Sequence, residues 1–260
     1  FFLILKYLNP FSKKYKKVLA FDGGGVRAIM GVYFLKKLEE ESSKSIFDSF
    51  DLFIGTSAGA TNALMLGMNG YKIKDLEKFW TIDNLKRIMN QSFIDKTSIF
   101  QTRPKYSNEG KKEILHNFFI NKKIGQSLKP VIVTAYDLEA RKPILLSSYG
   151  DPEVTAVQAA NASSAAPIYF PTVSMEDGRW LIDGGIATNN PSLLGYIEAK
   201  KIFSTNNIKV LGIGAGLNKR KISGKNSRNW GALGWLRHDI LGIMLESSLQ
   251  NEILKDLIGD

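Results

Sequence analysis

A short glycine-rich turn between an apolar segment and a helix-forming segment constrains the fold of this chain most. Residues 55–59 read Gly-Thr-Ser-Ala-Gly, directly after the apolar segment 51–54 and before the helix-forming stretch 60–68. A strand, a turn of small residues and a helix form the setting in which G-x-S-x-G becomes a nucleophile elbow. We therefore predict that Ser57 lies exposed at the end of a buried strand, beside the free N–H groups of the next helix. Such a serine suits covalent acyl transfer; a glycine-rich turn with an incidental serine is the alternative.

Alternating strand and helix patterns predict the fold class. Period-two and continuous apolar patterns predict strands over 18–21, 51–54, 130–136, 144–147, 180–182 and 209–213. Helical spacing predicts helices over 28–41, 60–68, 73–89, 110–119, 154–165 and 192–203. This order indicates an α/β protein with three layers, α/β/α, and a mainly parallel central sheet covered on both faces.

The length of the chain bounds the number of domains. With 260 residues, 44% of them hydrophobic, the chain can bury a full core. No stretch rich in Pro, Gly or Ser divides it. We predict a basic and apolar N-terminal segment over 1–16 and one catalytic domain over 17–260, whose final helix stops as a truncated C-terminus would.

The composition excludes several kinds of site. The chain has no cysteine, which rules out disulfides, a thiolate nucleophile and cysteine-bound zinc. It has two histidines, His116 and His238, too few for a histidine-rich metal site. No stretch approaches the ~20 apolar residues that a membrane-spanning helix needs.

The net charge of +10 is concentrated in two stretches without acidic residues. The first twenty residues contain Lys6, Lys13, Lys14, Lys16 and Lys17; residues 199–238 contain Lys200, Lys201, Lys209, Lys219, Arg220, Lys221, Lys225, Arg228 and Arg237. Such surfaces attract nucleic acid or anionic lipid, the latter at about 1 kcal/mol per basic residue near a membrane. A solvated, lysine-rich surface without a partner is the alternative.

Two further segments follow predicted strands, where α/β sheets gather their ligands. The first is Asp22-Gly-Gly-Gly-Val-Arg27. Its glycines can aim backbone N–H groups at an oxyanion, worth roughly 3 to 4 kcal/mol for one donor, while Arg27 binds a phosphate or rigidifies the loop. The same segment, ending at Ala28, also fits the dinucleotide-binding pattern G-x-G-x-x-[G/A], although Asp22 would place a carboxylate beside the pyrophosphate.

The second segment, Asp183-Gly-Gly, offers a base for the serine. A partly desolvated carboxylate close to a serine hydroxyl can accept its proton. The order Ser57, Asp183, His238 also permits a hydrolase triad. The surroundings of His238 give no strand-to-loop setting, however, and His116 lies within a predicted helix, so we expect both histidines to be structural or on the surface.

Four motifs in order resemble the patatin-like phospholipase family. They are DGGGVR (22–27), GTSAG (55–59), ASSAAPIYFP (162–171) and DGG with a trailing NNP (183–191), and the resemblance spans roughly residues 17–215. It implies a patatin-like fold and a calcium-independent Ser–Asp dyad without cofactor or metal, with Ser57 as nucleophile and Asp183 as general base. It also implies that Gly23, Gly24, Gly25 and the N–H of Ala58 form the oxyanion hole, with Arg27 in the same loop.

The resemblance implies a lipid acyl hydrolase of the phospholipase A or lysophospholipase type. The expected substrates are membrane phospholipids or lysophospholipids, and the expected partner is an anionic membrane surface rather than nucleic acid. We expect a cytoplasmic protein with peripheral membrane association. Two alternatives stay open: a dinucleotide-binding oxidoreductase that uses the GGGVRA loop, and a non-catalytic lipid-binding module. No motif names an activator or an oligomeric state.

Overall fold

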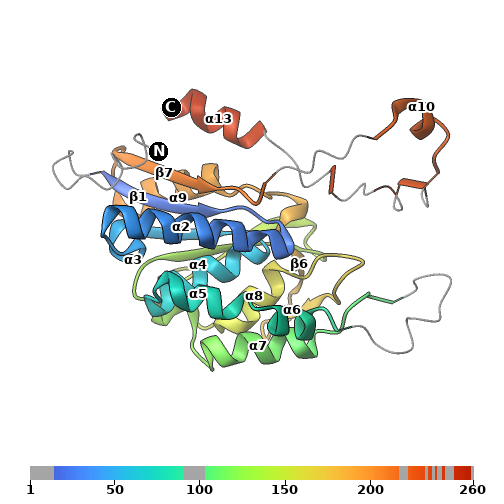
Figure 1. Cartoon of the computed structure of the whole chain (residues 1–260), viewed down its shortest axis with the longest axis horizontal. Coiled ribbons are helices and arrows are strands. Elements are labelled where there is room, and N and C mark those ends of the chain that lie inside the picture. The colour runs from blue at the N-terminus through green and yellow to red at the C-terminus, as the bar shows by residue number, and fades with distance from the viewer. Residues whose placement is uncertain are drawn as a thin grey trace.

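A seven-stranded sheet runs through the middle of the protein (Figure 1). The computed structural model describes residues 15–90, 103–216, 222–231, 234–235, 238, 242–243 and 249–258, so the predicted segment 1–16 lies outside it except for its last two residues. The strands are β1 (Lys16–Phe21), β2 (Leu52–Gly55), β3 (Val131–Asp137), β4 (Lys142–Ser147), β5 (Val173–Ser174), β6 (Trp180–Asp183) and β7 (Ile208–Ile213). Their order is β5-β6-β3-β2-β1-β7, and β4 also pairs with β3. The centre, β3-β2-β1-β7, is parallel, while β4, β5 and β6 pair in antiparallel fashion.

Helices cover both faces of this sheet. The described helices are α2 (Ile29–Ser42), α3 (Ile46–Ser49), α4 (Ala58–Asn69), α5 (Ile73–Phe79), α6 (Ile82–Ile88), α7 (Glu109–Phe119), α8 (Ala156–Ser163), α9 (Ser192–Phe203), α10 (Gly224–Ser227) and α13 (Leu249–Ile258), with 3-10 turns η1 (Gly25–Ala28), η3 (Ile124–Gln126) and η4 (Gly184–Ile186). Successive residues of β1 face opposite layers, since Val18 and Ala20 join the core beside α9, whereas Leu19 and Phe21 join the core beside α2 and α4. The predicted three-layer α/β/α fold is confirmed.

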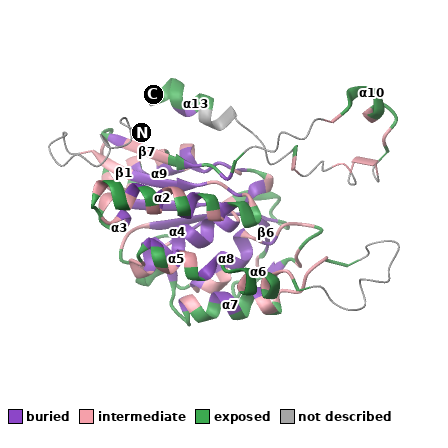
Figure 2. Cartoon of the chain, in the orientation of Figure 1, coloured by how far each residue is buried: buried purple, intermediate pink, exposed green. Residues whose placement is uncertain are grey.

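The middle of the molecule is its most completely buried part. Every residue of α4 from Ala58 to Met68 is buried, and Figure 2 shows this helix surrounded by other elements. Because α4 begins directly after Ser57, the helix that follows the predicted nucleophile is held in place by burial on all sides. No helix among the described residues is long and apolar enough to cross a bilayer.

The helix predicted over 73–89 is wrong in one respect, because the structure divides it into α5 and α6. Thr81 begins α6, and its hydroxyl accepts a hydrogen bond from the backbone N–H of Asn84. Trp80, just before it, donates its indole N–H to the side-chain oxygen of Asn62 on α4, at 2.8 Å. A helix-capping residue thus starts a new helix where the buried indole is held against α4.

Strand β3 determines where the ends of two other strands meet. β4 pairs with one edge of β3 over residues 132–137 of β3. β2 and β6 therefore share the other edge of β3. β2 runs parallel to β3 and ends with Gly55 opposite Val133; β6 runs antiparallel and ends with Asp183 opposite Ala135. The two strands therefore approach each other head-on, with Thr134 of β3 between their ends. This register brings the residues after β2 next to the last residue of β6.

We predict that Gly184→Ala destabilises the protein. A Cβ at this position would lie 2.2 Å from the hydroxyl oxygen of Thr134 and 2.5 Å from its backbone carbonyl carbon, and the backbone of β3 cannot move away. Overpacking of this kind costs about 1–3 kcal/mol of unfolding free energy, measurable by urea denaturation. Gly224→Ala is the matched control, because an added Cβ there meets nothing within 4 Å. An equal loss in both variants would contradict the prediction.

Candidate active site

Ser57 occupies a sharp bend between β2 and α4. Its backbone φ is 54° and ψ is −125°, a conformation that costs a residue with a side chain about 1–3 kcal/mol. The flanking glycines make the bend possible. A Cβ on Gly55 would lie 2.4 Å from the carbonyl oxygen of Gly59, and a Cβ on Gly59 would lie 2.5 Å from the carbonyl oxygen of Asp22. The elbow geometry predicted from the sequence is present.

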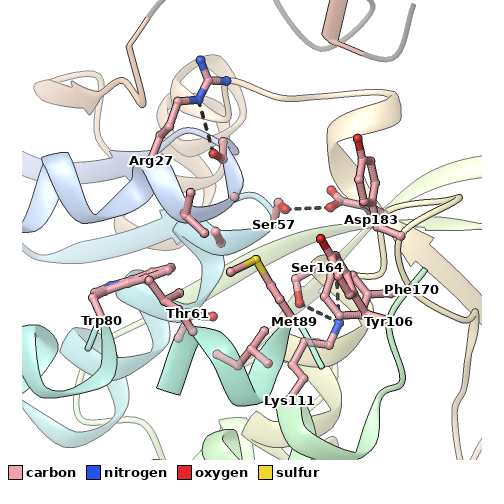
Figure 3. Close-up of a pocket in the computed structure, with 18 of the residues that line it drawn as sticks. Arg27, Ser57, Thr61, Trp80, Met89, Tyr106, Lys111, Ser164, Phe170 and Asp183 are labelled. Carbon is pink, nitrogen blue, oxygen red and sulfur yellow. Dashed lines mark hydrogen bonds between the residues drawn. The ribbon is translucent and has the colours of Figure 1, made fainter. Parts of the chain in front are cut away.

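The hydroxyl of Ser57 donates a hydrogen bond to the carboxylate of Asp183. Its Oγ lies 2.6 Å from Asp183 Oδ2, and Figure 3 shows this contact as a dashed line. The other carboxylate oxygen, Oδ1, accepts from the backbone N–H of Gly185 at 2.8 Å. The backbone N–H of Asp183 donates to the carbonyl oxygen of Ala165 at 3.1 Å. The structure thus brings both predicted dyad residues together and holds Asp183 at both of its carboxyl oxygens and at its backbone.

Burial tunes the carboxyl group of Asp183. The residue is 5% exposed, and loss of hydration raises the pKa of Asp183 to about 6. The hydrogen bonds from Ser57 and Gly185 and the positive charge of Lys111 oppose this rise. At neutral pH the carboxylate is therefore ionised, yet it is more basic than an exposed aspartate. Both properties suit a group that accepts a proton from a serine.

Neither histidine hydrogen-bonds to this pair in the described part of the chain. The ring of His238 stacks on the indole of Trp230 at a centroid distance of 3.9 Å. His116 lies exposed on α7. The Ser57 hydroxyl bonds to Asp183 instead. The geometry therefore contains a hydrogen-bonded pair, Ser57 and Asp183, and the alternative triad with His238 has no contact among the described residues to support it.

The glycine loop lies against the elbow, but its amides are not equivalent. The N–H of Gly23 donates to the carbonyl oxygen of Asn189 at 3.0 Å, so this amide, which we expected in the oxyanion hole, is already engaged. Gly24 and Gly25 line the same cavity as Ser57, as does Ala58, whose N–H is the first of α4. The geometry narrows the candidate oxyanion donors to the amides of these three residues.

Arg27 braces the loop from its outer side. Its backbone N–H donates to the carbonyl oxygen of Gly24 at 3.2 Å, and its Nε lies 3.5 Å from the same oxygen. The side chain is exposed, and its guanidinium points away from Ser57 (Figure 3). Of the two roles that the sequence suggests, the observed contacts fit rigidification of the loop. A phosphate-binding role stays a prediction.

Ser163, the last residue of α8, and the two residues after it, Ser164 and Ala165, each hold one group of the site. Ser163 Oγ accepts from the backbone N–H of Ser57 at 2.9 Å. Ser164 accepts from the ammonium group of Lys111, and the carbonyl of Ala165 accepts from Asp183. The sequence indicated this segment only as part of a family motif. Its role in holding the site depends on contacts with residues 18 to 106 positions away in the sequence.

Two ionisable groups that have lost much of their hydration were not predicted as parts of the site. Lys111 on α7 is 4% exposed, and burial lowers the pKa of its ammonium group to about 7. Asp22, before the glycine loop, is largely buried; this raises its pKa to about 7 against the effect of a hydrogen bond with Asn190. One oxygen of Asp22 has no hydrogen-bond partner among the described residues. A signal for Lys111 was present, since it shares the apolar face of α7 with Ile114 and Leu115.

The dyad opens into a largely apolar cavity of about 470 Å³. Ser57 and Asp183 lie together in its wall (Figure 3), and Gly24 and Gly25 line the same cavity. Apolar and aromatic side chains form most of the wall, from α5 to α8 and the segments beside them: Phe79, Trp80, Leu85, Ile88, Met89, Tyr106, Leu115, Tyr169 and Phe170. A volume of this size accommodates a small organic ligand or chain. No group of three or more His, Cys, Asp or Glu that could hold a metal ion occurs among the described residues.

An elbow serine, a buried carboxylate at the ends of strands and an apolar cavity define an α/β protein with a hydrolase-type site. The chain belongs to the patatin-like phospholipase family, whose sequence model, described as Patatin-like phospholipase, matches residues 19–194. The family supports a lipid ester hydrolase and argues against a dinucleotide-binding oxidoreductase.

Individual relatives agree with this assignment. The chain is 30% identical to Patatin-like protein 1 of Arabidopsis thaliana over 89% of this chain and 67% of that protein. It is 31% identical to a cGAMP-activated phospholipase of Pseudomonas aeruginosa over 76% of this chain and 61% of that protein. The crystal structure of VipD from Legionella pneumophila has a similar fold, with a TM-score of 0.53 at 15% identity over 89% of this chain and 55% of that one. The chain thus spans about two thirds of the curated relatives and about half of the solved structure.

Proposed function

We propose that this chain is a lipid acyl hydrolase of the phospholipase A or lysophospholipase type, acting through Ser57 and Asp183. The observation that supports this most directly is the 2.6 Å hydrogen bond from the Ser57 hydroxyl to the buried Asp183 carboxylate in the wall of an apolar cavity. The family assignment supports the substrate class.

In the proposed mechanism, Ser57 Oγ attacks the ester carbonyl carbon while its proton moves to Asp183. The negative charge that forms on the carbonyl oxygen is stabilised by the amides of Gly24, Gly25 and Ala58. Asp183 then gives the proton to the leaving alcohol, which leaves an acyl group on Ser57. Water attacks this ester with Asp183 as general base, releasing the fatty acid and the free serine.

The cavity suits the acyl chain of such a substrate. Its wall is apolar apart from a few polar groups near the dyad, so it can shield a hydrocarbon chain from water. Leu64 and Met65, apolar residues close to the elbow in sequence, are fully buried in the core and do not line it. Aromatic side chains such as Trp80 and Phe170 line it instead.

We propose that the rim of the cavity, rather than the basic stretches, contacts the membrane. Of the seven basic residues of those stretches that the structure describes, five lie at the edge where β1 and β7 begin and α9 ends, namely Lys16, Lys17, Lys200, Lys201 and Lys209; Lys225 and Arg228 lie in and beside α10. Ser57 follows the opposite end of the parallel strands. Val26 and Tyr169, which line the cavity, expose apolar surface, and so does Met30 at the start of α2, just after the glycine loop. Such side chains can enter the acyl boundary of a bilayer.

We predict that Ser57→Ala and Asp183→Asn each lower hydrolysis by about a thousandfold or more, because each removes one half of the proton-transfer pair. Fatty acid release from phosphatidylcholine and lysophosphatidylcholine measures this, alongside hydrolysis of a short-chain p-nitrophenyl ester. His238→Ala, which alters a histidine outside the dyad, keeps most activity.

The same assay separates the alternatives. Because one relative is named for activation by cGAMP, a wild-type protein without activity is assayed again with that cyclic dinucleotide. Vesicle binding without fatty acid release under both conditions would favour a non-catalytic lipid-binding module and contradict the proposal. Activity that persists in Ser57→Ala would contradict the assigned nucleophile.

We predict that removal of metal ions leaves the activity unchanged. The proposed steps use a carboxylate and backbone amides, so they need no metal to activate water or to stabilise the oxyanion. Hydrolysis is measured after dialysis against EDTA and again after addition of Ca²⁺ or Mg²⁺. A loss with EDTA that Ca²⁺ restores would show that the calcium-independent mechanism is wrong.

We predict that Met30→Glu weakens vesicle binding by up to about tenfold, because it places a charge where an apolar side chain would enter the bilayer. Flotation with anionic vesicles measures binding, and hydrolysis of the soluble ester is expected to stay unchanged. Ile197→Glu on α9 is the matched control, since Ile197 is similarly exposed but lies on the other face of the sheet. Equal loss in both variants would place the contact elsewhere.

A further inference from the structure

A buried lysine lies in the wall of the cavity that holds the dyad. Lys111 on α7 is 4% exposed, and its side chain points toward the segment that carries Ser164 (Figure 3). Removal of an ammonium group from water costs several kcal/mol unless the surroundings compensate. A lysine is almost never fully buried without a partner. The contacts of this side chain therefore indicate what it does.

The ammonium group of Lys111 is anchored at one place. Its Nζ donates to the backbone oxygen of Ser164 at 3.1 Å and to the hydroxyl of the same residue at 3.3 Å. It also lies 3.8 Å from the ring centroid of Phe170, within the range of a cation–π interaction. These neutral groups hold the charge in position without neutralising it.

The charge of Lys111 acts on Asp183. Lys111 and Asp183 line the same cavity, and adjacent residues hold both: Ser164 accepts from the ammonium group of Lys111, and the carbonyl of Ala165 accepts from the backbone N–H of Asp183. The opposite charge of Asp183 raises the pKa of Lys111, whereas Lys112, exposed on the same helix, lowers it. Three groups lower the pKa of Asp183 and so favour its carboxylate: the hydrogen bonds from Ser57 and Gly185, and the positive charge of Lys111. Burial lowers the pKa of Lys111 to about 7 and raises the pKa of Asp183 to about 6, while each charge favours the charged form of the other group.

We propose that Lys111 is a positioning residue for the dyad: its ammonium group, anchored by Ser164, keeps the carboxylate of Asp183 ionised and ready to accept the proton of Ser57. The inference rests on the proposed function, because it requires Asp183 to be the proton acceptor. In the acylation step the proton moves from Ser57 Oγ to Asp183, and Lys111 neither gives nor takes a proton. Its effect is therefore electrostatic.

The pH dependence of Lys111→Met tests this proposal. Loss of the positive charge raises the pKa of Asp183, so the carboxylate becomes protonated at higher pH. An opposite charge nearby shifts a carboxyl pKa by about 1–3 units. We expect the acid limb of kcat/KM for the soluble ester, followed over pH ~5 to ~9, to move up by about one unit or more. For a shift of one unit, the variant near pH ~6 keeps about a tenth of its alkaline plateau and the wild type about half, while the plateau itself changes little.

Three variants separate an electrostatic effect from a structural one. Lys112→Met removes the same charge from the exposed neighbour, and its acid limb is expected to match that of the wild type. Lys111→Arg keeps a positive charge and is expected to restore most of the wild-type limb. Ser164→Ala removes one of the two acceptors and is expected to move the limb in the same direction as Lys111→Met, by less. Ser164→Ala decides the question if Lys111→Met does not fold.

The outcomes distinguish this inference from the proposed function. If Ser57→Ala is inactive and Lys111→Met has a lower plateau with an unchanged acid limb, the proposed function stands and the role of Lys111 is overturned. A shift in Lys111→Arg as large as in Lys111→Met overturns it as well. If Ser57→Ala is as active as the wild type, the proposed function fails and this inference fails with it.

Discussion

The shared edge of β3 is the constraint on which the site depends. β2 and β6 reach this edge from opposite directions, and their last residues pair with β3 only two positions apart. The serine after β2 and the aspartate that ends β6 therefore meet without a long loop between them. Backbone hydrogen bonds of the sheet set this distance, and the small residues at Gly55, Gly59 and Gly184 permit the close approach. The 2.6 Å contact of the dyad follows from sheet register.

Burial gives this contact its chemical character. The carboxyl group of Asp183 has lost most of its hydration, and the protein replaces it with a hydroxyl, an amide and a nearby ammonium group. Desolvation makes the carboxylate more basic, while these three groups keep it ionised. The balance between the two effects matters more than either alone, because a fully desolvated carboxyl would be protonated and a fully hydrated one would be a weak base. The apolar cavity beside it supplies the desolvation.

The sequence predicted those features that depend on neighbours along the chain. The strand-turn-helix pattern at Ser57, the alternation of strands and helices and the Asp183 turn all have local signatures, and the fold was predicted correctly from them. Features that depend on contacts across the fold were missed: the engaged amide of Gly23 needs Asn189, and the break between α5 and α6 accompanies the bond from Trp80 to Asn62. Lys111 on an apolar helix face gave a signal, but only the structure identifies what faces it.

The bracket formed by residues 163–165 has a mechanical consequence. Ser163, Ser164 and Ala165 hold the backbone of Ser57, the ammonium group of Lys111 and the backbone of Asp183, respectively. Because the three residues are adjacent, the lengths of these three hydrogen bonds are coupled. A small rotation at the end of α8 would lengthen all of them in one movement. The position of the nucleophile, the lysine and the aspartate therefore depends on one short segment of the chain.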